Sequence, residues 1–479
     1  MTLSVHNIFS GIYVRMVLAG AALSASAMPA TAAIDLGVGR QATVGAYIYD
    51  LKGDSVVLAD NADVAMTPAS VVKSFTTASA LQNLGKDWRF ETRVALSGSR
   101  GAKGVWNGDI IIFPGGDPTL DSENPGGKSG ICDSIIYALR DMGLHTVTGS
   151  VVIADTVPDQ GQAPYWENED TPYPYGAGWF NLNWKDNTFS IWPATGKTAP
   201  HVPDLEIVKI RRRNSGIGRG TGSERLYVYG RNLKNRRRCE TTTMPYPYKA
   251  FAYALRKRLG ENGIDVKGRY RKEGDPATIA GMKLTPVCTY YSEPLLTIMR
   301  DLMYRSDNTF AEGVLRAQAP GASREAAVKA EIELWRGNCV DTDGQLFRDG
   351  SGLSRSTSVT PRFIGDVLGY MAKSDYRDDY VSLYARAGRD GTVRNLLKET
   401  PLAGRMALKS GSMSGVRCYA GYALDEDGAP GYVVVLFVNR YSCSGASLRT
   451  AIEKFMVENM APRLGVADKI TDDDERKCQ

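Results

Sequence analysis

The chain has 479 residues, of which 43% are hydrophobic and 23% charged, so it can bury a sizeable core and form two or three domains. The formal net charge of +5 is modest, and the chain contains only three histidines. Only His145 and His201 follow residue 33, and neither has a nucleophile or carboxylate motif beside it, which argues against a Ser-His-Asp hydrolase and an H-E-x-x-H metalloprotease.

Residues 1–33 are predicted to be a secretory signal peptide. Arg15 precedes the apolar run 16–27, and Ala30-Thr31-Ala32 fits an A-x-A cleavage site. No cysteine stands at the cleavage point, which argues against lipidation there. No later stretch is long and apolar enough to span a bilayer. We therefore expect an exported protein of the periplasm or cell envelope, with at most peripheral membrane contact and no nucleic-acid partner.

The cysteines and the basic clusters give weaker indications. The seven cysteines lack any C-x-x-C spacing, so no metal site is predicted, and one or two disulfides are possible but cannot be assigned. Arg211-Arg212-Arg213 and the basic run 234–238 are expected to be solvated strand ends. The alternative is a loose electrostatic hold on an anionic envelope polymer or lipid surface.

The first elements predicted after the signal peptide are a β-hairpin and a helix. Residues 43–50 and 55–58 are β-rich runs separated by the turn Lys52-Gly53-Asp54. A helical pattern rich in small and apolar residues then begins at 67–73 and ends at Gly85, a typical C-cap residue.

The middle of the chain has a different texture, with many glycine-rich turns and short β runs. The Pro-, Tyr- and Trp-rich segment 156–178 is predicted to be an ordered surface loop. The remaining predicted elements are strands at 108–113, 146–154, 205–211, 225–230 and 264–270 and helices near 131–142 and 247–260.

Helical patterns return after residue 290, and the chain closes with a strand meander and a helix. The predicted helices are 293–305, 309–317, 321–336, 360–373 and 445–460, and the strands are 405–411, 416–424 and 431–438. The order of these elements predicts one α/β domain that is interrupted by an insertion. Its boundaries are predicted as signal peptide 1–33, discontinuous domain 34–94 and 286–465, insertion 95–285 and acidic tail 466–479.

The helix that begins at 67–73 carries an S-x-x-K motif, Ser70 to Lys73. Ser70 lies in the first turn, where free backbone N–H groups and the helix dipole favour a developing oxyanion. Lys73 shares its helix face and could act as a base if burial or charge lowers its pKa. The pattern alone is equally compatible with a capping serine and a solvated lysine.

Two further motifs follow in a fixed order. Ser306-Asp307-Asn308 ends a predicted helix, and Lys409-Ser410-Gly411 lies on a predicted strand. Second copies of these patterns at Ser122-Glu123-Asn124 and Lys128-Ser129-Gly130 crowd one loop in the wrong order, so we discount them. The ordered set S-x-x-K, S-x-N and K-[ST]-G indicates a penicillin-interacting serine enzyme.

With these motifs, the chain resembles the D-alanyl-D-alanine carboxypeptidase/endopeptidases of the penicillin-binding protein 4 type (class C low-molecular-mass penicillin-binding proteins). The resemblance includes 116–120 (GDPTL) and 349–355 (DGSGLSR), and the large insertion between Lys73 and Ser306 suits it. It implies a serine transpeptidase/β-lactamase-like α/β (α+β) domain with a large β-rich insertion. The chain departs from the family in having Ser410 and Ser412 where threonines are usual, and Thr357 where asparagine is common.

The chemistry and the resemblance together assign roles to the motif residues. Ser70 is expected to form an acyl-enzyme with Lys73 as its base, and Ser306 to relay a proton towards the leaving amine. Asn308 is expected to hold the substrate peptide amide. The other expected roles are the substrate carboxylate site at Lys409, Ser410 and Gly411 and an oxyanion hole from the backbone N–H groups of Ser70 and Ser412.

The resemblance also implies a pocket for the zwitterionic end of a diaminopimelate side chain. Asp117, Arg355, Met413 and Ser414 are its predicted residues, since an ammonium and a carboxylate call for one anion and one cation on the enzyme. The structural alternative is a turn aspartate and a surface arginine. The insertion contains no second catalytic constellation, so we expect it to shape access and specificity, with Asp117 as its direct contribution to the pocket.

The leading hypothesis is therefore a DD-carboxypeptidase/DD-endopeptidase that acts on peptidoglycan stem peptides without a cofactor and is inhibited covalently by β-lactams. One alternative is a β-lactamase or esterase on the same core, which the absence of a clear Glu-x-x-x-Asn element after Ser306-Asp307-Asn308 disfavours. The other is a non-catalytic envelope scaffold, which three intact motifs disfavour.

Overall fold

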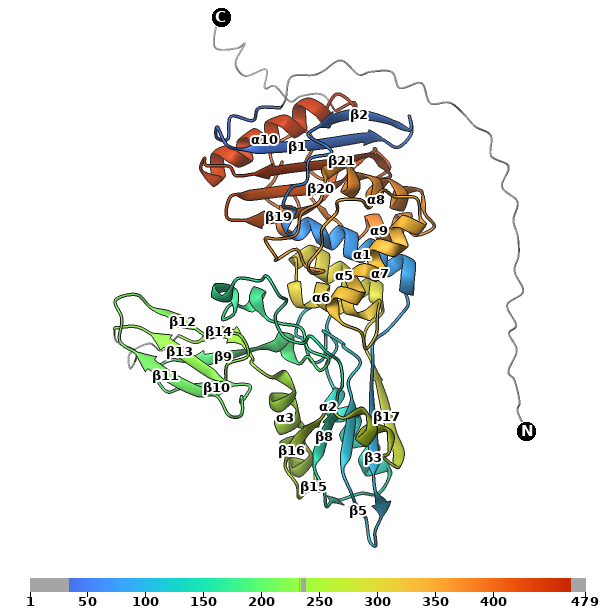
Figure 1. Ribbon diagram of the computed structural model, residues 1–479, viewed down its shortest axis with the longest axis vertical. Helices are drawn as coiled ribbons and strands as arrows, with labels where there is room; N and C mark the ends of the chain where they lie inside the picture. Colours follow the sequence, from blue (N-terminus) through green and yellow to red (C-terminus); the bar gives the residue numbers. More distant parts are fainter. Residues whose placement is uncertain (1–33, 232, 234–237, 467–479) are drawn as a thin grey trace, which may run out of the picture. The chain divides into compact units, whose positions relative to one another are not determined.

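The computed structural model describes residues 34–231, 233 and 238–466 (Figure 1). The predicted signal peptide, residues 467–479 of the predicted acidic tail (with Cys478), and Lys234, Arg236 and Arg237 therefore lie outside the described residues. Within the described part, no helix combines the length and the apolar character needed to cross a membrane. The six cysteines in that part are all free thiols.

One six-stranded antiparallel sheet brings the two ends of the described chain together. Its N-terminal hairpin pairs with the last strand of the C-terminal meander, along a register that runs from Thr43↔Asn439 to Asp50↔Tyr432. In spatial order the strands are β18 (Ala385–Arg386), β19 (Met406–Met413), β20 (Val416–Leu424), β21 (Pro430–Asn439), β1 (Thr43–Asp50) and β2 (Ser55–Asp60).

Both faces of this sheet are covered, because alternate residues of its central strands point to opposite sides. Val433, Val435 and Phe437 pack into a core with the long helices of the domain. Their neighbours Val434 and Leu436 pack into a second core with the C-terminal helix on the opposite face (Figure 1). The helices are α1 (Val72–Leu84), α5 (Leu295–Arg305), α6 (Asn308–Ala317), α7 (Arg324–Gly337), α8 (Pro361–Lys373) and α9 (Arg377–Val381) on one side and α10 (Gly445–Met460) on the other.

The segment between α1 and α5 builds several smaller sheets around a third core. The five-stranded sheet has the spatial order β16 (Tyr270–Glu273), β8 (Val151–Ala154), β6 (Ile110–Phe113), β3 (Glu91–Ser97) and β17 (Leu284–Tyr291). The four-stranded sheet has the spatial order β15 (Asp265–Val266), β7 (Thr146–Val147), β5 (Val105–Asn107) and β4 (Ser99–Arg100). One three-stranded sheet consists of β10 (Lys197–Ala199), β9 (Thr188–Trp192) and β14 (Glu240–Thr243). The other consists of β11 (Glu206–Ile210), β13 (Arg225–Tyr229) and β12 (Gly216–Gly218). The helices here are α2 (Ile131–Asp141), α3 (Pro247–Glu261) and α4 (Pro276–Ala280).

The chain enters and leaves this segment through β3 and β17, which pair with each other in antiparallel fashion. Neither strand was predicted. Two predicted strands are each divided in two: 146–154 into β7 and β8, and 264–270 into β15 and β16. Gly149 lies in the first break, where a Cβ atom would lie 2.4 Å from the Gly108 carbonyl oxygen, so the backbones approach too closely for a regular strand.

Candidate active site

Ser70 lies in a 3₁₀ turn, η1 (Ala69–Val71), that leads directly into α1. The preceding residue, Ala69, has a φ of 47°, a left-handed conformation that costs a non-glycine residue about 1–2 kcal/mol. Such strain is characteristic of functional sites, because the surrounding structure has to maintain it. Helix α1 is buried along most of its length, which fixes the turn that carries Ser70.

Lys73 is completely buried, and its Nζ atom is 3.0 Å from the Ser70 Oγ atom. The amine also contacts the Asn308 side-chain oxygen at 2.7 Å and the Ser351 carbonyl oxygen at 2.6 Å. The last two groups can only accept hydrogen bonds. A neutral amine therefore donates its two protons to them and directs its lone pair at the serine hydroxyl, which is the arrangement a general base requires.

Burial lowers the pKa of Lys73 from 10.5 to about 8, because desolvation disfavours the ammonium form. Three carboxylates, those of Asp349, Asp307 and Glu312, oppose this shift by raising the pKa. About a tenth of the amine is consequently neutral at pH 7, far more than a lysine with the ordinary pKa provides, as the predicted base role requires.

The S-x-N motif occupies the junction between α5 and α6. Ser306 is the C-cap of α5 in a left-handed conformation, and Asp307 caps α6 by accepting a hydrogen bond from the Phe310 N–H at 2.9 Å. This sharp junction directs Ser306 Oγ at the Lys409 amine, 2.9 Å away. Asn308 uses both ends of its amide, since its nitrogen also donates to the Tyr175 carbonyl at 2.7 Å.

The K-S-G motif lies on β19, beside the start of α1. Lys409 is buried and donates to Ser306 and to the Ser410 carbonyl at 2.7 Å. Desolvation and the charge of Lys73 hold the pKa of Lys409 well below its usual range. The Ser410 hydroxyl donates to the Thr392 hydroxyl at 2.7 Å.

Gly411 allows β19 to approach the nucleophile. A Cβ atom at this position would lie 2.4 Å from the Pro68 carbonyl oxygen and 3.1 Å from the Ser70 backbone nitrogen. Any larger residue would push the strand away from η1. The backbone of Gly411 is therefore close to the Ser70 nitrogen, and Ser412, whose N–H is the other predicted oxyanion-hole donor, is the next residue on the strand.

A cavity of about 370 Å³ opens beside these residues. It brings together most of the predicted site, with Lys73 and Lys409 buried behind it. Its lining residues are Ser70, Asp170, Tyr175, Ser306, Asn308, Leu353, Arg355, Ser412, Met413 and Ser414.

The structure does not place Asp117 among the lining residues. Asp117 is 1% exposed, and its carboxylate accepts hydrogen bonds from the Thr119 N–H at 2.8 Å and the Thr119 hydroxyl at 2.6 Å. The side chain is turned into its own Asp-Pro-Thr turn, as the structural alternative had it. Burial also raises the pKa of Asp117 to about 6.

Asp170 is the acidic residue of the cavity that the sequence reasoning missed. It ends the 3₁₀ turn η2 (Asn168–Asp170) within the predicted ordered loop, and it accepts a hydrogen bond from the Tyr175 hydroxyl at 2.7 Å. Arg355, also in the lining, is 3.5 Å from the Glu167 carboxylate and donates to the Ser414 carbonyl at 3.4 Å. The cavity thus contains one anion and one cation. The only sequence indication was a run of acids in an aromatic-rich loop.

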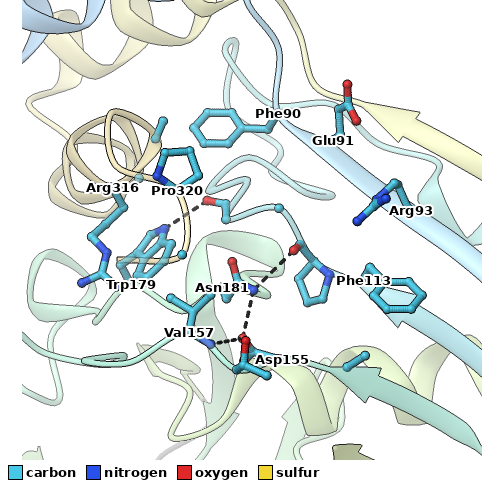
Figure 2. A pocket seen from close by; sticks show the side chains of 18 of the residues that line it. Phe90, Glu91, Arg93, Phe113, Asp155, Val157, Trp179, Asn181, Arg316 and Pro320 are labelled. Carbon is cyan, nitrogen blue, oxygen red and sulfur yellow. Dashed lines mark hydrogen bonds between the residues drawn. The ribbon is translucent and has the colours of Figure 1, made fainter. Parts of the chain in front are cut away.

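A larger cavity of about 530 Å³ lies elsewhere and contains none of the motif residues. Figure 2 shows its wall, where Asn181 bridges the Asp155 carboxylate and the backbone. That carboxylate already has protein partners, including Asn181 at 2.9 Å and the Lys272 amine at 2.8 Å. Because none of the three motifs reaches this larger cavity, we assign the reaction to the smaller one. In the described part, no group of three or more His, Cys, Asp or Glu residues is arranged to hold a metal ion.

Comparisons with known proteins show which family the chain is similar to. The model of the D-Ala-D-Ala carboxypeptidase 3 (S13) family matches residues 31–460. A D-alanyl-D-alanine carboxypeptidase of Actinomadura sp. (strain R39) is 26% identical over 427 residues, which cover 82% of this chain and 77% of that protein. The D-alanyl-D-alanine carboxypeptidase DacB of Haemophilus influenzae is 25% identical over 447 residues, which cover 85% and 87%.

The fold also matches a solved structure over almost its whole length. The crystal structure of penicillin binding protein 4 (dacB) from Haemophilus influenzae superimposes with a TM-score of 0.76 at 22% identity, covering 89% of this chain and 99% of that one. The same protein has been solved with a β-lactam, with a TM-score of 0.72 to this chain. The predicted fold class and family resemblance are thereby confirmed.

Proposed function

The chain belongs to the D-Ala-D-Ala carboxypeptidase 3 (S13) family, and from that premise we propose that it is a serine DD-peptidase of peptidoglycan. It cleaves the terminal D-Ala-D-Ala bond of stem peptides through an acyl-enzyme on Ser70, and β-lactams acylate the same serine. The observation that carries this proposal is the buried Lys73 amine, 3.0 Å from Ser70 Oγ, whose other two partners are acceptors only.

Acylation starts when neutral Lys73 takes the Ser70 hydroxyl proton as the oxygen attacks the carbonyl carbon between the two D-alanines. The carbonyl oxygen becomes an oxyanion, which the backbone N–H groups of Ser70 and Ser412 would stabilise. Each such donor is worth roughly 3–4 kcal/mol in other hydrolases. When the C–N bond breaks, the departing amine receives a proton and an ester to Ser70 remains.

Ser306 and Lys409 would supply the proton that the departing amine receives. The Lys409 amine is 2.9 Å from Ser306 Oγ, so Ser306 gives its hydroxyl proton to the departing amine and takes one from the Lys409 ammonium. Water then attacks the ester and gives a proton back through Ser306 to Lys409, while Lys73 returns its proton to the Ser70 oxygen as the shortened peptide leaves. Lys409 and the Ser410 hydroxyl also suit the terminal carboxylate of the substrate, a group that both D-Ala-D-Ala and penicillin carry.

The cavity supports a second activity, cleavage of D-Ala-diaminopimelate cross-links. A diamino-acid side chain ends in an ammonium and a carboxylate, and we assign the ammonium to Asp170 and the carboxylate to Arg355. Met413 and Ser414 would line the same pocket. Asp170 thus takes the role that sequence reasoning gave to Asp117, because only Asp170 lines the cavity.

Two structural proposals accompany this function. We place the division between the catalytic domain and the insertion at β3 and β17, since these paired strands are the connections between the two. We also propose that the protein is exported to the periplasm or cell envelope, where its substrate is, from the signal-peptide pattern at 1–33.

The test is labelling with a fluorescent penicillin, followed by digestion of purified sacculi and identification of the released muropeptides. We expect a persistent label on the wild type, none on Ser70→Ala, and release of D-alanine from pentapeptides. An unlabelled wild type refutes the proposal and leaves the scaffold alternative. Turnover of a chromogenic cephalosporin at rates that rival peptide hydrolysis would identify a β-lactamase instead.

A further inference from the structure

We propose that Glu312 is a positioning residue for acylation: its buried carboxylate fixes the Gly350–Ser351 backbone so that the Ser351 carbonyl orients the Lys73 amine towards Ser70. The inference rests on the proposed serine chemistry and extends it to a residue that lies outside the three motifs.

Glu312 lies on α6 and has no exposed surface. One carboxylate oxygen accepts hydrogen bonds from the Gly350 N–H at 2.9 Å and the Ser351 N–H at 3.0 Å. The other accepts from the Arg324 guanidinium at 3.1 Å, an ion pair that is itself buried. Burying such a charge costs free energy, and this buried carboxylate holds two backbone N–H groups that belong to no helix or strand.

The two residues that Glu312 holds face α1 with their carbonyl groups. The Gly350 carbonyl accepts from the Thr76 hydroxyl at 2.9 Å, and the Ser351 carbonyl accepts from the Lys73 amine at 2.6 Å. A Cβ atom on Gly350 would lie 2.7 Å from the Leu315 Cβ atom, so the segment is pressed directly against α6. The N–H groups of this segment are therefore bonded to α6 and its carbonyl groups to α1. These bonds on both sides leave the Ser351 carbonyl little freedom to move.

The direction of that carbonyl decides what Lys73 can do. With acceptors at Ser351 and Asn308, a neutral amine has no proton left for Ser70 and must accept the serine proton. If the Ser351 carbonyl turned away, the amine could donate to Ser70 Oγ instead, and the serine would lose its base.

The charge of Glu312 acts on Lys73 as well. Lys73 is faced by the carboxylates of Asp307 before α6, Glu312 on α6 and Asp349 in the adjoining loop, which raise its pKa, and by the amine of Lys409 on β19. Removing one carboxylate therefore lowers the pKa of Lys73 further. The charged groups around Glu312 itself are Arg316, Arg324, Glu331 and Asp349.

The experiment measures the rate constant of acylation by a fluorescent penicillin as a function of pH. For Glu312→Gln we expect the plateau of the acylation rate to fall at least tenfold. Both oxygens of Glu312 accept hydrogen bonds, whereas the glutamine amide has only one oxygen that can accept. The midpoint of the rise with pH should also move down, because one of the carboxylates that raise the pKa of Lys73 is lost. Glu312→Asp keeps the charge but shortens the reach, so its plateau should fall while its midpoint stays.

Glu331→Gln is the matched control. Glu331 is 1% exposed and lies on the neighbouring helix α7, and it accepts a hydrogen bond from Gln318 at 2.6 Å. It has no described contact with the Gly350–Ser351 segment. We expect both the plateau and the midpoint of this variant to match the wild type, which separates loss of the Ser351 anchor from loss of any buried acid.

A Glu312→Gln variant that acylates with the wild-type plateau and midpoint overturns the inference. If that variant does not fold, Thr76→Val removes the other anchor of the same segment, and it should lower the plateau without moving the midpoint. An unchanged plateau in both Thr76→Val and Glu312→Asp would then also overturn the inference. A wild type that is not acylated refutes the proposed function instead.

Discussion

Asp170→Asn isolates the charge that we assign to reading the ammonium of a diamino-acid side chain. Asparagine keeps the shape of the residue and an oxygen that can accept from the Tyr175 hydroxyl, so the 3₁₀ turn should persist. A charge-assisted hydrogen bond is worth roughly 1.5–3 kcal/mol when desolvated, and an exposed pair often less than ~1 kcal/mol. Asp170 is half-buried, which favours the lower end. At about 1.4 kcal/mol per decade, kcat/KM should fall about tenfold.

The assay compares two peptides that differ only in whether the side-chain amine is free or acetylated. We expect the loss for the free amine alone, with fluorescent penicillin acylation unchanged, since penicillin lacks that ammonium. Asp117→Asn is the matched control, and it should weaken the buried turn with Thr119 and lower all three activities equally. The reasoning is refuted if Asp170→Asn affects the three compounds alike, or if the selective loss appears in Asp117→Asn.

The remaining predictions concern the catalytic groups. Acylation should rise as the pH rises through about 8, because burial lowers the pKa of Lys73 and only the neutral amine is a base; a rate that is flat from pH 6 to pH 9 would contradict this. Lys409→Ala should lower kcat/KM more for substrates with a free terminal carboxylate than for amide-capped analogues. Equal losses in kcat/KM would reassign Lys409 to the proton relay alone. Gly411→Ala should destabilise the fold by about 1–3 kcal/mol and slow acylation, because its Cβ atom would overlap the Pro68 carbonyl; near-native melting and labelling would show that β19 can shift freely.

Elements whose signal is local were predicted from the sequence. The continuous apolar run of β21 and the run of small and apolar residues that ends at Gly85 predicted these elements closely, because each is buried on all sides and is bounded by turn or cap residues. The three motifs were found for the same reason, since each is a short fixed spacing on one element. The missed β17 shows the limit: it contains Pro286 beside a register shift, and its partner β3 is nearly 190 positions away.

The specificity pocket could not be predicted in the same way. Whether an aspartate faces a cavity depends on the turn that carries it, and sequence spacing does not determine that direction. Asp117 has a threonine two residues later, a pattern in which the carboxylate accepts hydrogen bonds from its own turn. Asp170 reaches the cavity from the loop 156–178, which lies against the start of α6 through the hydrogen bond from Asn308 to the Tyr175 carbonyl.

That loop also changes the role expected for the insertion. The Lys73 amine donates to two acceptors, the Asn308 side-chain oxygen and the Ser351 carbonyl. The insertion contacts Asn308 itself and the loop that contains Ser351. The Tyr175 carbonyl accepts from the Asn308 amide at 2.7 Å, while the Trp166 indole donates to the Asp349 carboxylate at 2.7 Å, in the loop that contains Ser351. The insertion therefore does more than shape access: it supports the geometry on which the proposed base role of Lys73 depends. Because Tyr175 also lines the cavity, we expect its hydrogen bond to Asn308 to connect the wall of the proposed substrate site to the proposed base.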